Sequence, residues 1–461
     1  MNRSFSIYVC QSCGSETRQY FGRCPNCSEW NSIVEEIASK AKQKKTNRKT
    51  VGNINSYKSK PISEDHCQTF NRINTGYEEF DRVLGGGIVP GSVTLVGGDP
   101  GIGKSTLLLK SANYMSSKNR VLYVTAEESA HQVNLRWKRV NKEKSELHLF
   151  AETDLDEIIN EIINFSPKIV VIDSIQAINY ENLSSAPGSV AQVRECSAAL
   201  QRIAKENDIA LLIVGHVTKE GSLAGPKVLE HLVDAVLTFE GDRYLSNRLL
   251  RAAKNRFGAT NELGVFEMTG NGLEEVINPS ELFLSRESAP GVATTVACEG
   301  SRPIAIDLQA LTNPTTYASP RRTATGVENN RLHQILAVIE KHLGIALSRQ
   351  DCYLAVAGGL TVDEPAADLC MAGAIFSSFK NAEFNKGIVF IGEVGLGGQL
   401  RQVKQVELRI QESIRLGFKT IVLPFNDQNK FAIYKKKIKI IELKNLREVF
   451  SQDILFKQIK L

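Results

Sequence analysis

A glycine-rich stretch in the first quarter of the chain has the residues needed to hold nucleotide phosphates. The apolar run SVTLVGG leads into GDPGIGKST and then into the helical LLLKSANYM. In this order of strand, loop and helix, backbone N–H groups and a helix N-terminus surround a phosphate. Lys104 is expected to neutralise the β and γ phosphates, and the Ser105 hydroxyl to bind Mg²⁺. The predicted Mg-ATP loop consists of Gly98, Asp99, Pro100, Gly101, Ile102, Gly103, Lys104, Ser105 and Thr106.

Two acidic positions that follow apolar runs are candidates for the chemistry itself. IVVIDS at 169–174 contains Asp173, which is placed to hold magnesium through its water shell when a phosphate loop lies upstream. YVTAEES carries Glu127 and Glu128 just past another run. Glu127 is the candidate catalytic base that polarises the attacking water. The alternative, an acid that complements the dipole of a helix N-terminus, fits Glu128 better.

Four cysteines near the N-terminus are spaced as metal ligands. Cys10 and Cys13 form one CxxC pair, and Cys24 and Cys27 form a second pair ten residues further on. Each pair brackets a tight turn, so that four thiolates can converge tetrahedrally on one zinc ion. The alternative is a redox dithiol, but two pairs with a short loop in a reducing compartment favour a structural zinc ribbon.

Aromatic and basic residues lie between and beside these cysteines. Tyr20, Phe21 and Trp30 are close in sequence to Arg18 and Arg23. Rings next to cations stack on nucleic-acid bases in many proteins, yet a small zinc module also needs aromatic rings as its core. The sequence leaves both interpretations open.

The rest of the chain alternates apolar runs of strand length with helical stretches. From Arg72 to about Asn278 the runs are SVTLVGG, RVLYVTAE, IVVIDS, IALLIVGH, AVLTFEG, RLLRAAKNR and VFEMTG. A second series from about Ser288 to Leu461 contains TTVACEG, PIAIDLQAL, CYLAVAGG, KGIVFIGEVG and KTIVLP, with a loop predicted at 312–326. The alternation in the first series predicts a mainly parallel sheet covered by helices on both faces, and the second series predicts a second α/β domain. We expect an α/β protein with a zinc finger at 1–34, a basic linker at 35–65, an ATPase domain at 66–285 and a second α/β domain at 286–461.

Composition places few limits on partners but several on location. The formal charge of +5 is mild for 461 residues, so partner arguments depend on where basic residues cluster. One cluster is the linker stretch from Ala38 to Lys60, which has eight Lys or Arg and no acid, and is either a solvated tether or a nucleic-acid contact. No apolar run approaches the roughly 20 residues of a membrane span. With no signal peptide and no disulfide pattern, we expect a cytoplasmic protein without membrane association.

The combination of the two CxxC pairs, the GDPGIGKST loop and KNRFG at 254–258 resembles the RadA (Sms) family of bacterial DNA repair proteins over essentially the whole chain. The resemblance implies an α/β fold with a RecA-like P-loop ATPase core, an N-terminal zinc ribbon and a C-terminal domain similar to the Lon protease domain. It also implies a DNA-stimulated ATPase that forms hexameric rings and promotes branch migration. The expected partners are single-stranded and branched DNA and a RecA-type recombinase, and the expected cofactors are ATP, Mg²⁺ and Zn²⁺.

The family motif KNRFG comprises Lys254, Asn255, Arg256, Phe257 and Gly258. Alternation along a strand points the side chains of Lys254 and Arg256 the same way. By similarity to ring-forming relatives of RecA and DnaB, these two cations reach the γ phosphate of the neighbouring subunit and stabilise transition-state charge. The alternative is an ordinary surface pair on a hairpin.

Two further segments resemble the DNA-facing loops of RecA-like motors. VGHVTKEGSLAGPKVLEH at 214–231 supplies His216, Lys219 and Lys227, and SIQAINYENLSSAPGSVAQVRE at 174–195 supplies Arg194. Flexible glycines let such lysines follow a phosphate backbone, and His216 occupies the switch position between nucleotide and loop. A lone histidine also often has a purely structural role.

The C-terminal segment resembles Lon but lacks its catalytic residues. Ala366 stands where the Lon serine motif carries its nucleophile, and Glu407 stands where Lon carries its lysine. Without an activated hydroxyl and its base there is no acyl-enzyme route. A Lon-type ATP-dependent protease is therefore the weaker alternative, and a KaiC-like regulatory ATPase or autokinase explains neither the zinc pairs nor KNRFG. We expect the domain to serve as a scaffold for oligomerisation and DNA contact.

Overall fold

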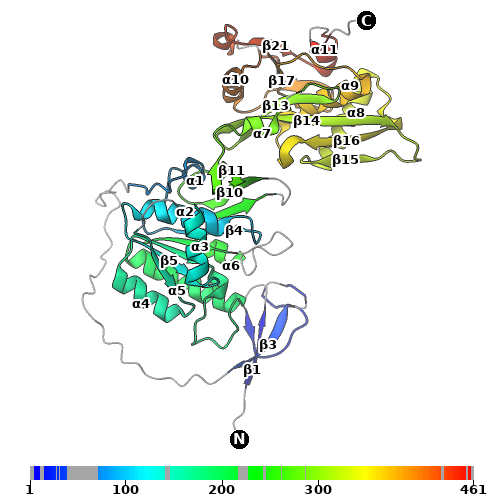
Figure 1. Cartoon of the computed structure of the whole chain (residues 1–461). Coiled ribbons are helices and arrows are strands. Elements are labelled where there is room, and N and C mark those ends of the chain that lie inside the picture. Colours follow the sequence, from blue (N-terminus) through cyan, green and yellow to red (C-terminus); the bar gives the residue numbers. More distant parts are fainter. Residues whose placement is uncertain are drawn as a thin grey trace, which may run out of the picture. The chain divides into compact units, whose positions relative to one another are not determined.

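The computed structural model forms two compact units, Met1–Glu275 and Val276–Leu461, whose elements are labelled in Figure 1. The residues that it describes are 5–10, 15–26, 28–30, 32–38, 71–140, 146–215, 227–241, 246–260, 262–285, 287–426, 430–452 and 455–457. The predicted basic linker lies outside these residues from 39 onward. Within them, no helix combines the length and the apolar character that crossing a membrane requires.

The N-terminal module is a small antiparallel sheet in the order β2-β1-β3. Its strands are β1 (Phe5–Cys10), β2 (Glu16–Thr17) and β3 (Ile33–Ala38). Cys10, Cys24 and Ile33 are buried together, with Tyr8 packed against them. So small a core is typical of a module that a metal ion holds together.

The first unit is built on a nine-stranded sheet in the order β12-β11-β10-β9-β4-β8-β7-β5-β6. Its strands are β4 (Val93–Gly98), β5 (Val121–Thr125), β6 (His148–Ala151), β7 (Ile169–Asp173), β8 (Ala210–Val214), β9 (Ala235–Glu240), β10 (Asn247–Asn255), β11 (Leu263–Thr269) and β12 (Gly272–Glu275). The pairs from β6 through β4 to β9 are parallel, as predicted, whereas β9 to β12 pair antiparallel. Short connections between β9 and β12 leave no room for the crossover that parallel pairing needs.

Helices cover both faces of this sheet. They are α1 (Glu78–Leu84), α2 (Lys104–Ser116), α3 (Ala130–Val140), α4 (Leu155–Phe165), α5 (Val190–Glu206) and α6 (Lys227–Leu232), with the 3-10 turn η1 (Ile175–Ala177). Side chains alternate between the two faces along β7. Val171 packs in the apolar core beneath α1, α2 and α3, and Val170 and Ile172 pack in the core beneath α4, α5 and α6. This two-faced burial explains why the central strands are continuous apolar runs.

The second unit contains a mixed sheet in the order β13-β14-β16-β15 and a parallel sheet in the order β17-β20-β21. Its strands are β13 (Val292–Glu299), β14 (Arg302–Pro314), β15 (Arg322–Thr325), β16 (Gln350–Val356), β17 (Ile388–Phe390), β18 (Glu393–Val394), β19 (Leu400–Arg401), β20 (Thr420–Pro424) and β21 (Lys439–Leu443). Its helices and 3-10 turns are α7 (Ser280–Phe283), α8 (Asn329–Leu343), α9 (Asp368–Lys380), α10 (Val406–Arg415), α11 (Leu446–Phe450), η2 (Leu347–Arg349), η3 (Ala357–Gly359), η4 (Pro365–Ala367) and η5 (Ala432–Tyr434).

The prediction of a loop at 312–326 is wrong at both ends, where the structure has strands. Strand β14 continues to Pro314, and Arg322–Thr325 forms β15, whose Ala324 pairs with Leu354 of β16. The stretch is rich in Thr and Pro, but a neighbouring strand offers its backbone groups partners, and this tertiary pairing outweighs local turn preference.

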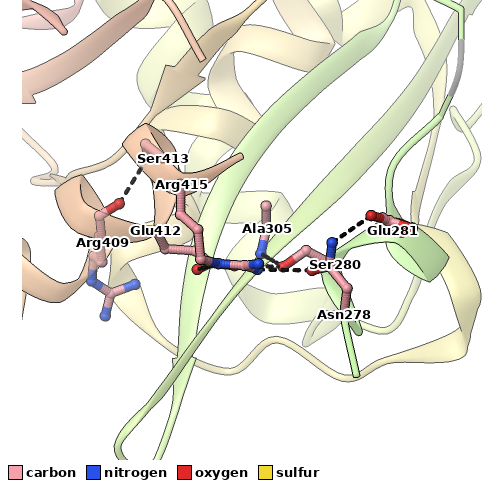
Figure 2. A network of polar contacts seen from close by, with 8 residues as sticks. All are labelled: Asn278, Ser280, Glu281, Ala305, Arg409, Glu412, Ser413 and Arg415. Carbon is pink, nitrogen blue, oxygen red and sulfur yellow. Dashed lines mark hydrogen bonds and ion pairs between the residues drawn. The ribbon is translucent and has the colours of Figure 1, made fainter. Parts of the chain in front are cut away.

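The segment just after β12 is fastened to the second unit, as Figure 2 shows. The Ser280 hydroxyl donates to Glu412 Oε1 (2.9 Å) and accepts the N–H of Ala305 (3.0 Å), and Arg415 donates to Asn278 Oδ1 (2.7 Å). These bonds tie the segment to α10 and β14. The second compact unit therefore includes residues 276–285 and begins ten residues before the predicted domain boundary at 285/286. The predicted domain limits remain a prediction.

Candidate nucleotide-binding site

The loop after β4 has a backbone that only glycine adopts readily. Gly98, Gly101 and Gly103 have φ of 151°, 80° and 119°. A Cβ on Gly98 would lie 2.6 Å from the carbonyl oxygen of Phe239, whereas one on Gly101 would meet nothing within 4 Å. The loop is thus packed on one side and open on the other, as a loop that surrounds a phosphate must be. The residues present fit the nucleotide that the sequence predicts.

Lys104 is the first residue of α2 and only 4% exposed. Its ammonium donates to the carbonyl oxygens of Gly98 (2.6 Å) and Asp99 (2.9 Å). Burial lowers the pKa of this lysine, and the nearby carboxylates of Asp173, Glu127 and Asp99 act in the opposite direction. The fold therefore brings Lys104, Asp173 and Glu127 together from three separate stretches of sequence. Ser105 and Thr106 follow in the first turn of α2, both half-buried.

Asp173 ends β7 at the carboxyl edge of the parallel strands and is 7% exposed. The hydroxyl of Tyr123, a wholly buried residue of β5, donates to Asp173 Oδ2 at 2.6 Å. Burial raises the pKa of Tyr123 well above its usual value, and the Asp173 carboxylate adds to the rise. Sequence reasoning missed Tyr123, because a tyrosine inside an apolar strand is indistinguishable from an ordinary core residue.

Glu127 and Glu128, adjacent in sequence, have different partners. Glu127 Oε1 accepts a hydrogen bond from the hydroxyl of Ser174 (2.6 Å), which is fully buried next to Asp173. Glu128 instead forms an ion pair with Arg136 of α3. The structure thus links Glu127 to the residue that follows Asp173 and pairs Glu128 with Arg136.

The motif at 254–258 is bonded into the sheet and helix framework. Lys254 donates to the carbonyl oxygens of Glu230 (2.5 Å) and Val233 (2.8 Å), and Arg256 donates to Asp234 Oδ1 (3.0 Å). Both cations therefore contact the segment from the end of α6 to the start of β9, although a register shift interrupts β10 between Ala252 and Lys254. Asp234, a buried carboxylate that sequence analysis missed, also accepts the N–H of Val93 (3.1 Å).

The remaining residues of the motif pack against α1 and the segments on either side of it. Asn255 donates to the carbonyl oxygen of Val83 (3.1 Å), and the carbonyl of Phe257 accepts from Arg72 (2.8 Å). A Cβ on Gly258 would lie 2.9 Å from the Cα of Gly85, so a side chain there has no room. Within one chain, Asn255, Phe257 and Gly258 thus have structural roles.

The phosphate loop and the cation pair lie at opposite edges of one sheet, at the ends of β4 and β10, which β9 separates. Asn255 pairs with Ala235 at the start of β9, Ala235 pairs with Thr94 of β4, and the loop begins four residues later at Gly98. Four residues of strand span about 13 Å, at roughly 3.3 Å per residue. This separation exceeds the reach of a lysine or arginine side chain, so neither cation reaches the phosphate loop of its own chain.

Of the four predicted zinc ligands, Cys10 and Cys24 are described and Cys13 and Cys27 lie outside the described residues. The N–H of Cys24 donates to the carbonyl of Glu29 (2.8 Å), and its own carbonyl accepts from Ser28 (2.9 Å), which makes the tight turn that a CxxC pair needs. Both described cysteines are buried in one small cluster, as ligands of a shared ion must be.

The rings near the cysteines lie at the surface. Trp30 is 68%, Tyr20 58% and Phe21 41% exposed, and the guanidinium of Arg23 lies 5.8 Å from the Trp30 ring centroid. This exposure suits stacking on bases, yet Tyr20 also packs edge-on against Tyr8, which borders the buried cysteine cluster, so both interpretations stay open.

The predicted DNA-contacting residues are only partly described. His216 and Lys219 lie outside the described residues, and Lys227 begins α6. Arg194 is exposed on α5. Two residues earlier, the buried side chain of Gln192 donates to the carbonyl of Ser185 (3.0 Å) and accepts the N–H of Tyr180 (2.9 Å), which fixes the shape of the preceding loop.

The second unit has no serine or lysine at the two Lon positions. Ala366 is buried in η4, and Glu407 is exposed in the first turn of α10. Two residues from each, Glu364 and Arg409 form a two-pronged ion pair with bonds of 2.7 and 2.5 Å. Both residues lie in the Lon-like segments, but sequence reasoning missed the pair, because nothing local to either residue indicates that the two meet.

Three families match parts of the chain. Residues 8–35 match the rubredoxin metal binding domain, residues 59–222 the AAA domain, and residues 320–427 the subunit ChlI of Mg-chelatase. Solved structures similar to this chain include the RadB recombinase (TM-score 0.36, 23% identity, 44% of this chain and 99% of that one) and a KaiC-like protein from Pyrococcus horikoshii (TM-score 0.37, 19% identity, 45% and 99%).

Curated relatives match nearly the whole chain. The DNA repair protein RadA of Synechocystis sp. is 51% identical over 454 residues, which cover 92% of this chain and 90% of the relative. The DNA repair protein RadA of Bacillus subtilis is 48% identical over 457 residues, which cover 98% and 100%.

Fold and site together define an α/β protein with a RecA-like P-loop ATPase core, an N-terminal zinc ribbon and a C-terminal ChlI- and Lon-like domain, which confirms the predicted fold class. A P-loop ATPase domain implies a nucleotide, and a zinc ribbon implies zinc. The chain belongs to the RadA family of DNA repair proteins, as its resemblance to that family predicted.

Proposed function

We propose that this chain is a DNA-dependent ATPase of recombinational repair that acts in the cytoplasm as a homo-hexameric ring on single-stranded and branched DNA and promotes branch migration. One observation carries the proposal. Lys104 and the acids Asp173 and Glu127 gather at the carboxyl edge of the central strands, while the cations Lys254 and Arg256 lie at the opposite ends of strands in the same sheet. An ATPase site divided in this way is completed by a neighbouring copy.

Each residue of the site has a role that its position supports. Bound Mg-ATP supplies the phosphoryl group and the charge that these residues act upon. The loop from Gly98 to Thr106 holds the phosphates, with Lys104 neutralising their charge, and Ser105 and Asp173 hold the magnesium ion and its waters. Glu127, oriented by Ser174, polarises the attacking water.

Lys254 and Arg256 act in the ring as trans-acting fingers. The side chain of Arg256 is 53% exposed while it contacts Asp234. Because the guanidinium side of this ion pair is half exposed, a phosphate of a neighbouring subunit can approach it and compete with the buried Asp234 as the partner. The carbonyl acceptors of Lys254 can likewise be exchanged for a phosphate oxygen.

The DNA contacts are assigned to loops at the centre of the ring. His216, Lys219, Lys227 and Arg194 follow the phosphate backbone, and the loop that Gln192 fixes sits next to Arg194. The zinc ribbon, with Cys10, Cys13, Cys24 and Cys27 as ligands, presents Tyr20 and Trp30 to DNA bases. A RecA-type recombinase is the expected protein partner.

ATP turnover with and without forked DNA tests this proposal. We expect forked or single-stranded DNA to raise turnover several-fold, and Lys104→Ala to abolish it because the phosphate charge is no longer neutralised. Lys110→Ala is the matched control: it removes a lysine from the same helix whose ammonium contacts the carbonyl of Leu273 instead, and turnover should persist. Turnover indifferent to DNA would favour a KaiC-like regulatory ATPase.

A protease is the second class to exclude. With Ala366 and Glu407 at the Lon positions, the chain should leave casein intact in the presence of ATP, DNA or both. Digestion of casein by protein purified to homogeneity would overturn the assignment of the second unit as a scaffold.

A further inference from the structure

Tyr123 and Asp173 come from adjacent parallel strands in a register that makes their contact possible. Asp173 pairs directly with Thr125 of β5, so Tyr123 lies two residues further back on the same face. Parallel strands lie about 4.8 Å apart and two residues rise about 6.6 Å, so the two positions are roughly 8 Å apart at the backbone. An aromatic side chain spans this gap, and a serine or threonine does not. A tyrosine is therefore the residue type that can deliver a hydroxyl to this carboxylate from inside the strand.

The contact itself is short and sheltered. The hydroxyl lies 2.6 Å from Asp173 Oδ2, within the range of a hydrogen bond to an ionised acceptor. Tyr123 is 0% and Asp173 7% exposed, so bulk water does not compete for either group. The phenol is the donor, since an ionised carboxylate can only accept. One oxygen of Asp173 is thus occupied before any ligand arrives.

We infer that Tyr123 is a positioning residue for magnesium: its hydroxyl holds Oδ2 of Asp173 and leaves Oδ1 to receive the waters of the ion. This inference deepens the proposed Mg-ATP site and rests on it. Fixing one oxygen prevents rotation of the carboxylate, so that its orientation is set in advance of binding. Phenylalanine would fill the same space without the donor, and the carboxylate would then be free to turn and would lose a charge-assisted bond.

The test measures magnesium dependence apart from turnover. Binding of a fluorescent ATP analogue is titrated with Mg²⁺ and, separately, measured in EDTA. For Tyr123→Phe we expect the half-saturating Mg²⁺ concentration to rise about tenfold, the effect of one hydrogen bond to a charged group. Affinity in EDTA should change less than about twofold, because the phosphate loop is untouched.

A matched control and a double-mutant cycle separate positioning from stability. Tyr77→Phe removes another buried hydroxyl of the same unit, which donates to the carbonyl of Leu273 (2.9 Å), and should leave both measurements unchanged. In an Asp173→Asn background, Tyr123→Phe should have almost no further effect on magnesium dependence, because Tyr123 acts through Asp173.

The measurements distinguish failure of the proposed Mg-ATP site from failure of the inference about Tyr123. If wild-type binding itself ignores Mg²⁺, the proposed Mg-ATP site fails. If wild-type binding depends on Mg²⁺ but Tyr123→Phe does not shift that dependence, only the inference fails. The inference is also overturned if the variant weakens binding equally in EDTA or does not fold, since the hydroxyl would then serve the core rather than the ion.

Discussion

Arg409 is among the largest side chains that are completely buried in the second unit, and its guanidinium has several partners. Besides Glu364, it donates to the carbonyl oxygens of Val296 and Lys404. Glu364 in turn accepts the N–H of Cys298 (2.8 Å). A buried charge is tolerated when it is paired and its remaining hydrogen bonds are satisfied, and both conditions hold here.

At the scale of single residues, we predict that removing one member of the Glu364–Arg409 pair destabilises the fold more than removing both. Glu364→Ala leaves the buried guanidinium without its counter-ion and should cost about 3–5 kcal/mol of unfolding free energy. The double variant Glu364→Ala, Arg409→Met removes both charges and should regain a large part of that loss. Urea unfolding of the full chain measures both. A double variant no more stable than Glu364→Ala would show that the guanidinium is not the source of the cost.

At the scale of elements, the zinc ribbon and the ATPase core depend on different residues. The described part of the ribbon has a core of three buried residues, Cys10, Cys24 and Ile33, which is too small to hold three short strands together without a metal. The phosphate loop, in contrast, is positioned by strands that share a large core. Losing the metal should therefore affect the ribbon alone.

We predict one zinc ion per chain in reduced protein and little zinc in Cys24→Ser, measured by elemental analysis after dialysis. Basal ATP turnover should survive, because the nucleotide site takes its residues from β4, β5, β7 and α2. Cys196→Ser, which alters a buried cysteine of α5, is the matched control and should keep its zinc. Wild-type protein without zinc, or Cys24→Ser with a full complement, would contradict the ligand assignment.

At the scale of the whole molecule, the proposed ring predicts that hydrolysis requires two neighbouring chains, because the cation pair lies away from the phosphate loop of its own chain. A chain with Arg256→Ala keeps its phosphate loop, and a chain with Lys104→Ala keeps its cations. Neither homomer should hydrolyse ATP at a normal rate, since loss of such a finger costs roughly 10³-fold or more. Mixed rings should regain part of the activity, because some interfaces combine both intact halves.

Two controls protect this mixing experiment. Both variants must assemble and exchange subunits, which negative-stain imaging with an ATP analogue and forked DNA would report. Asp234→Asn weakens the intrachain partner of Arg256 while keeping the cation, so it should retain hydrolysis if the cation acts on the neighbour. Inactive mixed rings, or normal turnover by Arg256→Ala with DNA, would leave the motif at 254–258 with a structural role only.

Much of this molecule is readable from local sequence. The phosphate loop is a contiguous stretch whose glycines and lysine are recognisable without any fold, and the CxxC spacing determines a turn by itself. All seven strand-length runs of the ATPase domain form strands. The runs of β4, β5, β7 and β8 are the clearest, because these strands are buried on both faces and are therefore continuously apolar. The short strands β6 and β12 escaped notice, since each has only four residues, which is too few to show an alternating pattern.

Other features exist only because distant residues meet. The pairing of β15 with β16 depends on a partner strand some 30 positions away in the sequence, and Glu364 finds Arg409 from another element of the fold. Tyr123 reads as one more apolar position until β7 brings Asp173 beside it. Sequence alone determined which groups are available for chemistry, because motifs are local. Tertiary structure decided which of those groups face each other and which are kept apart, because strand order and register set distances that no local pattern encodes.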